Sequence, residues 1–149
     1  MDLVADILDA EDIAALHAIP FAEIEQTWAD MLDMDASGKV ARDLARHDRF
    51  FLLTQGLGRL DAMHPWLYAR CREVEAAPDD HLDLWPREHY KSTVISFAGV
   101  IQEILRNPEI TIGIFSFNKP TARKFLRQIK YEFETNSLLK DIFPEILWA

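Results

Sequence analysis

A lysine followed by two hydroxyl residues, Lys91-Ser92-Thr93, stands where a short apolar run gives way to the pattern of an amphipathic helix. At a helix start, free backbone N–H groups and the helix dipole favour an anion, and a lysine adds a positive charge. In the common phosphate-binding loop, G-x-x-x-x-G-K-[ST], the lysine contacts phosphate and the following hydroxyl binds Mg²⁺. The pattern therefore predicts ATP and Mg²⁺ as ligands, with Lys91 on the phosphates and Ser92 on the metal.

The loop lacks both glycines of that pattern, because Trp85 and Tyr90 stand in their places. The run from Pro86 to Thr93, P-R-E-H-Y-K-S-T, resembles the deviant Walker A loop of terminase large subunits, the motors that package DNA into tailed-phage and prophage heads. In that family the first glycine is commonly lost and an arginine stands four residues before the lysine, as Arg87 does here. The resemblance implies a catalytic, phosphate-contacting role for Arg87. It implies a nucleotide-binding loop made of Arg87, Glu88, His89, Tyr90, Lys91, Ser92 and Thr93.

Two residues of the loop have more than one interpretation. Glu88 beside a bound phosphate would be repulsive, so we expect it to point to solvent or to pair with a cation. His89 could donate to phosphate or simply fill the loop, and a loop-forming role is the preferred interpretation. Tyr90 departs from the family, most of whose members keep a glycine before the lysine.

The resemblance continues through residues 110–149, where a buried strand, Ser116-Phe-Asn118, a basic helix and Asn136-Ser-Leu-Leu recur in the expected order. It implies a parent protein that drives DNA into a procapsid in the host bacterial cytoplasm. Its partners would be the procapsid portal and a small terminase subunit, and it could form a homo-oligomer. The family's Walker B strand, ending in the carboxylates that orient Mg²⁺ and activate water, is not found in the sequence, nor is its nuclease domain. We therefore expect this chain alone to lack ATPase activity.

The elements that would position the loop divide the chain into two regions. Apolar residues at helical spacing predict helices before Pro20, from Phe21 to Leu32, over Val40–Leu57 and over His64–Glu75, so residues 1–79 form a helical N-terminal region. Residues 80–149 form the truncated N-terminal part of a P-loop ATPase domain. There the short apolar run Leu82–Trp85 and the β-branched run Ile110–Phe117 predict two strands.

Between those runs an apolar stripe predicts a crossover helix over residues 94–105, so the sequence predicts an α/β fold built on a parallel βαβ unit. A last helix, with Asn118 near its start and Pro120 in its first turn, carries a predicted buried stripe: Ala122, Phe125, Leu126, Ile129 and Phe133. Its other face carries Arg123, Lys124, Arg127 and Lys130, either a solvated surface or contacts to a phosphate backbone. Phe50, Phe51 and Gln55 could line an adenine pocket, but core packing of the two rings is the preferred interpretation.

Charge is distributed unevenly. Residues 1–80 carry 7 Lys and Arg against 17 Asp and Glu, a net charge of −10, whereas residues 81–149 carry 9 against 8, a net charge of +1. The acidic half argues against nonspecific DNA binding there. Cys71 is the single cysteine, no Cys/His spacing suggests a metal site, and no apolar run is long enough to span a membrane.

Two other functions remain open from the residues. The chain could be a non-catalytic helical adaptor, or a prophage remnant, whose acidic helices bind a protein partner. It could also belong to another P-loop enzyme, such as a helicase or a nucleotide kinase.

Overall fold

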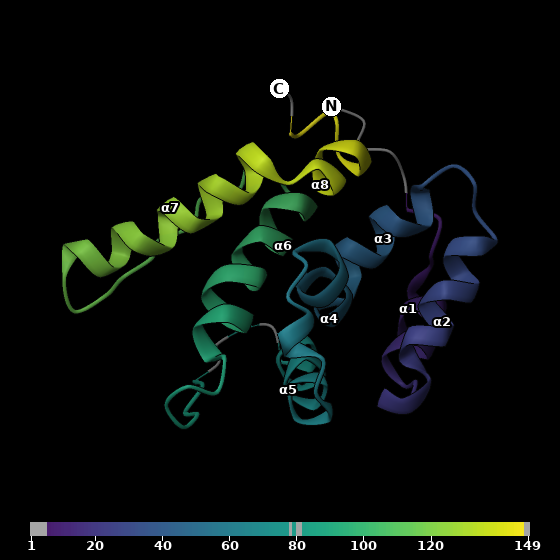
Figure 1. Cartoon of the computed structure of the whole chain (residues 1–149), viewed down its shortest axis with the longest axis horizontal. Coiled ribbons are helices and arrows are strands. Elements are labelled where there is room, and N and C mark those ends of the chain that lie inside the picture. The colour runs from purple at the N-terminus through teal and green to yellow at the C-terminus, as the bar shows by residue number, and fades with distance from the viewer. Residues whose placement is uncertain (1–5, 78, 80–81, 148–149) are drawn as a thin grey trace.

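The computed structural model of the chain describes residues 6–77, 79 and 82–147. Every regular element in those ranges is a helix, and Figure 1 shows coiled ribbons without an arrow. The π-helices η1 (Leu52–Gly56) and η3 (Thr93–Gly99) and the 3₁₀-helix η2 (Leu60–Ala62) lie between the α-helices. The α-helices are α1 (Ala10–His17), α2 (Phe21–Asp33), α3 (Lys39–His47), α4 (Arg49–Phe51), α5 (Pro65–Ala76), α6 (Val100–Arg106), α7 (Lys119–Thr135) and α8 (Ser137–Ile142).

The predicted α/β fold with its βαβ unit is wrong for the described residues. Neither Leu82–Trp85 nor Ile110–Phe117 forms a strand. Apolar side chains of both runs lie at the surface instead, Leu84 being 82% and Phe115 95% exposed. A strand requires a neighbour that pairs with its backbone, and these two runs do not pair with each other or with any other part of the described ranges. Strand propensity reflects packing on a sheet surface, so apolar composition alone did not produce one.

Helices predicted in the N-terminal region are present with shifted boundaries. Asp9 caps α1, because its carboxylate accepts the backbone N–H groups of Glu11 and Asp12 at 2.8 and 2.9 Å. The Asp12 carboxylate accepts the Asp9 N–H at 3.1 Å in return, so the first turn is closed by a capping box. Pro20 then stands at the N-cap of α2, where its missing N–H costs nothing.

The predicted single helix over Val40–Leu57 is interrupted at Asp48, which ends α3 and begins α4. Its fully buried carboxylate accepts the Phe51 N–H and the Trp28 Nε1–H, both at 3.0 Å. Arg72 of α5 donates to both carboxylate oxygens at 3.0 Å. The interruption therefore joins α2, α4 and α5 through one charged group, an arrangement that apolar periodicity does not reveal.

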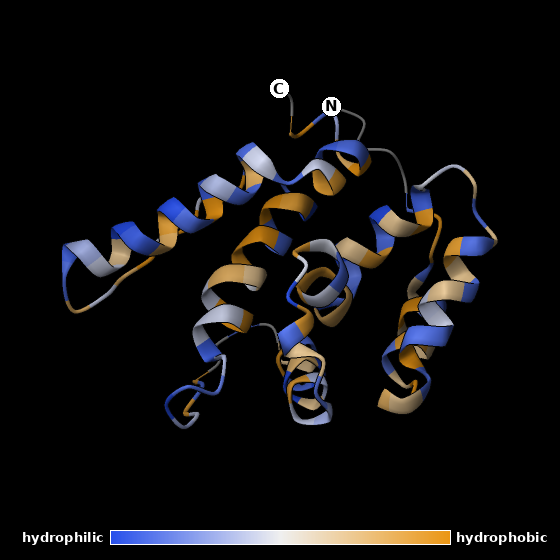
Figure 2. Cartoon of the chain, in the orientation of Figure 1, coloured by the Kyte–Doolittle hydropathy of each residue, from blue (hydrophilic) through white to orange (hydrophobic). Residues whose placement is uncertain are grey.

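The core lies where α2, α3, α4 and α5 meet the helix that follows the loop, as the inward-facing apolar colouring in Figure 2 indicates. Phe50 has no exposed surface, and its ring centroid lies 5.2 Å from Tyr68, 5.8 Å from Trp28 and 6.1 Å from Phe21. Burying one such side chain stabilises a fold by roughly 1.5–3 kcal/mol. Phe51 is also buried, so both phenylalanines pack in the core as predicted.

The predicted stripe of the helix after the loop is confirmed as the contact face of η3 and α6. Four of its residues are completely buried: Val94, Ala98, Ile101 and Leu105. This face packs against α3 and α4, so the helix that begins at Lys91 is fixed to the core.

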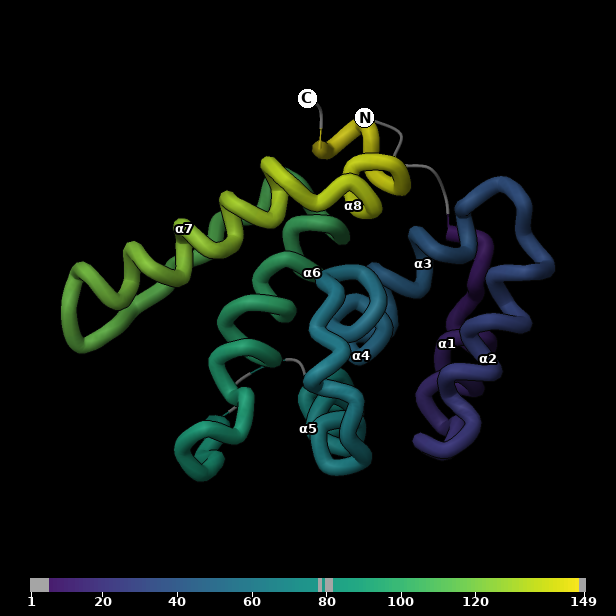
Figure 3. The backbone as a smooth tube through the Cα atoms, viewed as in Figure 1, coloured from purple at the N-terminus to yellow at the C-terminus, as the bar shows by residue number. Residues whose placement is uncertain are grey.

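Helix α7 begins as predicted, with the Asn118 side chain accepting the Thr121 N–H at 2.9 Å. Its predicted buried stripe is largely wrong, because only Ile129 is buried and Leu126 is 61% exposed. Figure 3 shows why: the first turns of α7 extend away from the other helices, and its last turn approaches α6 and α8. No helix within the described ranges is long and apolar enough to cross a membrane.

Candidate functional site

Backbone conformation distinguishes the loop that precedes η3. Glu88 and Tyr90 have φ angles of 62° and 61°, and they are the only residues other than glycine with positive φ in the described part of the chain. The left-handed conformation costs such residues on the order of 1–2 kcal/mol each. Alternating left- and right-handed residues turn successive N–H groups toward one concavity, a recurrent anion-binding arrangement. Tyr90 thus adopts the conformation for which a phosphate-binding loop ordinarily uses glycine.

Tyr90 also begins the helix and anchors the loop. Its carbonyl accepts the Val94 N–H at 2.9 Å, and its hydroxyl donates to Asp61 Oδ2 at 2.8 Å. Arg59 donates to both Asp61 oxygens at 3.0 Å and lies 5.8 Å from the Tyr90 ring centroid. The side-chain hydrogen bonds from Arg59, and then from Tyr90, lower the pKa of Asp61 to about 2. The loop is therefore held by an ionised carboxylate on η2, 29 residues before Tyr90 in the sequence.

Lys91, Ser92 and Thr93 occupy the first helical turn, as predicted. The Lys91 ammonium contacts the Asp83 carbonyl at 3.4 Å, a long hydrogen bond on the half-buried side of the helix. Ser92 and Thr93 instead line a hollow of about 710 Å³ between the helix start, α7 and Arg59. The hydroxyls and the ammonium of the predicted site thus leave the helix on different sides.

Basic and aromatic side chains surround the hollow. Arg59, Lys124 and Arg127 supply three positive charges against the one carboxylate of Glu132. Its aromatic walls are Phe97, Phe125 and Tyr131, and Thr121 and Gln128 complete the lining. A volume of 300–1,000 Å³ with cations and aromatic faces matches a phosphorylated, ring-containing ligand.

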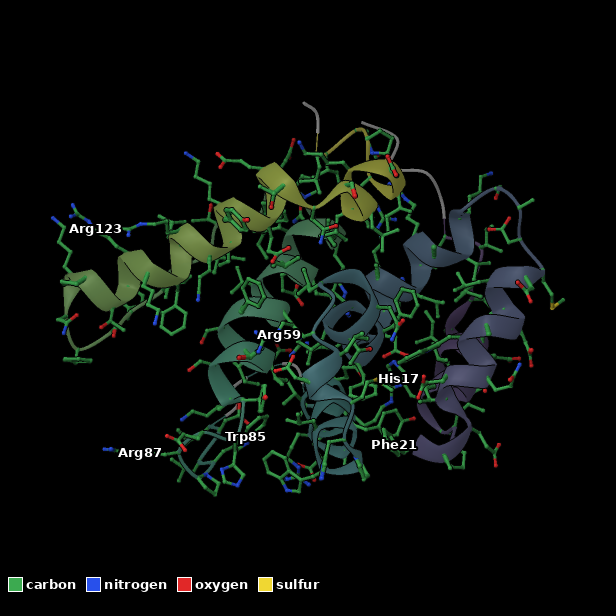
Figure 4. All side chains as sticks on the ribbon, in the orientation of Figure 1. His17, Phe21, Arg59, Trp85, Arg87 and Arg123 are labelled. Carbon is green, nitrogen blue, oxygen red and sulfur yellow. The ribbon has the colours of Figure 1, made fainter. Side chains whose placement is uncertain are left out.

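The remaining loop residues lie elsewhere. Arg87 is exposed, and Figure 4 shows its side chain pointing away from the body. Glu88, His89 and Tyr90 line a second hollow of about 400 Å³ together with Asp61, His64, Trp66 and Leu67. His89 Nδ1 lies 2.6 Å from the Arg87 carbonyl oxygen, and its ring packs against Trp66 with centroids 5.5 Å apart. The preferred interpretation of His89 as a loop-forming residue agrees with these contacts.

Arg59 is the residue of this site that sequence reasoning missed. It stands in a short segment without a motif, and only the fold brings it to the hollow beside Ser92. The basic stripe of α7 is divided: Lys124 and Arg127 line the hollow, whereas Arg123 points to solvent in Figure 4. Gln55 is half-buried and donates to Thr54 Oγ1 at 3.3 Å, apart from the hollow.

The residues present fit a polyphosphate better than they fit a preformed metal site. Among the described residues, no three His, Cys, Asp or Glu side chains are grouped to bind a metal ion. Mg²⁺ in nucleotide sites commonly takes its ligands from phosphate oxygens and water, with few from protein. Ser92, exposed at the hollow, is a suitable protein ligand for that arrangement.

Comparison with protein-family models, with curated proteins and with solved structures finds no match to this chain.

Proposed function

We propose that the loop from Arg87 to Thr93 binds the polyphosphate of ATP together with Mg²⁺. The observation that carries this proposal is the left-handed backbone of Tyr90 directly before the helical Lys91 and Ser92. A strained conformation in a bulky residue is uncommon unless the surroundings impose it, and such residues concentrate at binding sites. Such a conformation beside a helix start is suited to turning backbone N–H groups toward an anion.

Each residue has a defined part in the proposed site. The Lys91 ammonium reaches the phosphates by giving up its weak contact to the Asp83 carbonyl, and Ser92 supplies a hydroxyl to the metal. Lys124 and Arg127 of α7 add positive charge to the hollow that Ser92 lines. ATP would contribute its transferable γ-phosphoryl group when bound. Arg87 is exposed and free to turn toward a bound phosphate, as the sequence resemblance requires.

The parent activity that we propose is ATP-driven DNA packaging by a terminase large subunit. Support comes from the loop sequence, including Arg87 four residues before Lys91, and from the helix start that follows it. On this proposal the partners are DNA, the procapsid portal and a small terminase subunit, and the compartment is the host cytoplasm. The described residues form helices without the predicted βαβ unit, so the architecture argues against this parent activity.

A helical adaptor is the second candidate function, favoured by the architecture itself. The described ranges contain helices without a sheet, and the acidic residues of α1 and α2 lie mostly at the surface. In an adaptor the loop would be ordinary surface structure and the acidic helices would bind a basic protein. Nucleotide binding separates the two candidates, because only the first requires it.

Calorimetric titration with Mg-ATP tests the proposal, using wild type, Lys91→Ala and Lys39→Ala. We expect weak binding by wild type and a loss of about tenfold or more in Lys91→Ala, because a charge-assisted contact to phosphate is worth roughly 1.5–3 kcal/mol. Lys39 is a matched control: it also opens a helix and follows a left-handed residue, Gly38, with φ of 77°. Lys39→Ala should bind like wild type.

Equal affinity in wild type and Lys91→Ala would overturn the phosphate role of the loop. A folded chain that binds no Mg-ATP at all would leave the adaptor as the better function. Circular dichroism of each variant establishes that the helices are retained.

A further inference from the structure

Arg49 of α4 is a buried arginine that forms no ion pair with a carboxylate among the described residues, although its backbone N–H donates to Glu75 Oε1 at 2.5 Å. It is only 8% exposed. Its Nε donates to Gln102 Oε1 at 3.2 Å, and Gln102, fully buried, is itself fixed by donating to the Ala45 carbonyl at 3.3 Å. The two Nη atoms of Arg49 make no hydrogen bond to any other described residue. The Nη atoms are not sealed in the core but open to accessible space, where a ligand can reach them.

Other buried arginines of the fold are paired. Arg42 binds the Glu145 carboxylate, Arg46 donates to Asp6 at 3.1 Å, and Arg72 donates to Asp48 at 3.0 Å and to Glu75 at 2.8 Å. The carboxylates nearest to Arg49 are already engaged. Glu75 is paired with Arg72, and Glu103 is paired with Arg106 at 2.8 Å. Among the described residues, Arg49 is thus the buried arginine without an ion pair, although Arg42 Nε, Arg46 Nη2 and Arg72 Nε also lack a hydrogen-bond partner.

Arg49 lines a cavity of about 360 Å³ between α5, the helix formed by η3 and α6, and the segment that contains Ile112. Gly99 forms part of the wall and makes room for the guanidinium, because a Cβ at that position would lie 3.3 Å from Arg49 Cζ. Most of the remaining wall is apolar: Val74, Ala77, Ile95, Val100 and Ile112. A fixed guanidinium therefore faces a space whose walls are partly apolar and partly charged, because Glu75, Asp83, Glu103 and Arg106 also line it.

We propose that this cavity binds a small organic monocarboxylate, with its carboxylate on the two Nη atoms of Arg49 and its apolar chain against Ile95, Val100 and Ile112. The two Nη groups present parallel donors to a planar carboxylate, the geometry that makes such pairs strong. The apolar wall excludes a ligand that is charged throughout. Glu75, Asp83 and Glu103 also line the cavity, so a multiply charged phosphate is repelled where a single negative charge is accepted.

The electrostatic environment of Arg49 is consistent with a monocarboxylate ligand. Burial lowers the pKa of Arg49, and the negative charge of Glu75 only partly opposes that effect. The guanidinium nevertheless stays protonated, since its pKa begins so far above neutrality. A bound carboxylate would supply the charge compensation that the protein supplies to its other buried arginines.

Hexanoate is the probe for a test by ¹H–¹⁵N NMR on the full chain, with hexanamide and hexylammonium as uncharged and cationic analogues of equal length. We expect saturable shifts of the Gly99 amide with hexanoate, and at least tenfold weaker binding of both analogues, because only the carboxylate accepts both Nη donors. Inorganic phosphate should compete poorly. Equal binding of hexanamide, or no shift of Gly99 in the folded protein, would refute the site.

Two variants test whether the Arg49 guanidinium binds the carboxylate of hexanoate. Arg49→Gln should weaken hexanoate binding at least tenfold, and Arg49→Lys should weaken it severalfold, since a lysine keeps the charge but loses the paired donors. Arg123→Gln, an exposed arginine on α7, is the matched control and should bind as wild type does. If Arg49→Gln does not fold, Arg49→Lys and the hexanamide comparison decide. Unchanged binding in Lys91→Ala would show that the cavity acts independently of the phosphate loop.

Discussion

Tyr90 joins the phosphate loop to the body of the protein through its hydroxyl group. The left-handed conformation of this residue and of Glu88 costs on the order of 1–2 kcal/mol each, so contacts outside the loop must hold it. The Tyr90 hydroxyl donates to the Asp61 carboxylate, and Arg59 donates two hydrogen bonds to the same carboxylate. A carboxylate on η2 is therefore a determinant of loop shape, although it lies far from the loop in sequence.

Acid should weaken that support in a defined pH range. The hydrogen bonds from Arg59 and Tyr90 lower the pKa of Asp61 from 3.8 to about 2. Because the folded pKa is the lower one, the stabilisation is fully present above about pH 4 and is lost as pH falls through about 2. Urea unfolding of wild type and Asp61→Asn should therefore differ most at pH 5, with wild type more stable, and converge near pH 2. A constant difference from pH 5 to pH 2 would contradict the assignment.

Asp48 has the corresponding role at the scale of elements, because it separates α3 from α4 and fastens both to α2 and α5. Replacing it with alanine leaves Arg72 without its buried partner and removes the acceptor of the Trp28 and Phe51 N–H groups. Loss of one member of a buried ion pair costs about 3–5 kcal/mol. Asp48→Ala should thus lower the free energy of unfolding by that amount in urea denaturation.

Asp33 provides the control for that measurement. It is an exposed aspartate at the end of α2, so Asp33→Ala should change stability by no more than about 0.5 kcal/mol. Similar losses in the two variants would mean that the Asp48 network is not a main support of the fold.

Local signals predicted the helices well and the strands wrongly, for a physical reason. A helix satisfies its backbone within one segment, so a cap such as Asn118 or a stripe such as Val94 to Leu105 is sufficient to indicate it. A strand depends on a partner elsewhere, and the apolar run Ile110–Phe117 carries no information about whether one is present. The loop from Arg87 to Thr93 was predicted from the spacing of its lysine and hydroxyl residues and from a family resemblance, whereas Arg59 entered the candidate site only through tertiary structure.

At the scale of the whole molecule, the excess acidic charge and the exposed aromatic side chains lie in different parts of the described chain. The excess negative charge lies before residue 81, where helices α1 and α2 carry many of the acidic residues. Large apolar side chains are exposed in the two irregular segments after residue 81, among them Leu82, Leu84, Phe115 and Phe117, each at least 79% exposed. Charge repulsion therefore opposes association at the acidic helices, whereas the exposed apolar side chains after residue 81 favour it.

We predict that the purified chain self-associates despite its net charge of −9, and that it has no useful ATPase activity. Contact between exposed phenylalanines of two copies removes apolar area from water, at about 25 cal/mol per Å². Phe115→Ser with Phe117→Ser should shift sedimentation toward the monomer. Ser116→Ala, which changes an exposed polar residue between the two rings, should leave the sedimentation unchanged. An unchanged distribution in the double variant would show that these rings do not mediate association.

The expected lack of turnover follows from the same account of the site. Lys91 and Ser92 position a nucleotide, but hydrolysis also requires an oriented metal and an activated water, and each tenfold in rate corresponds to about 1.4 kcal/mol of barrier. Among the described residues, Glu132 is the one carboxylate that lines the hollow beside Ser92, and it accepts a hydrogen bond from Asn136 at 3.1 Å. Steady phosphate release by a monomer, lost in Lys91→Ala, would contradict this prediction. Loss of that activity in Glu132→Gln as well would identify Glu132 as the catalytic carboxylate.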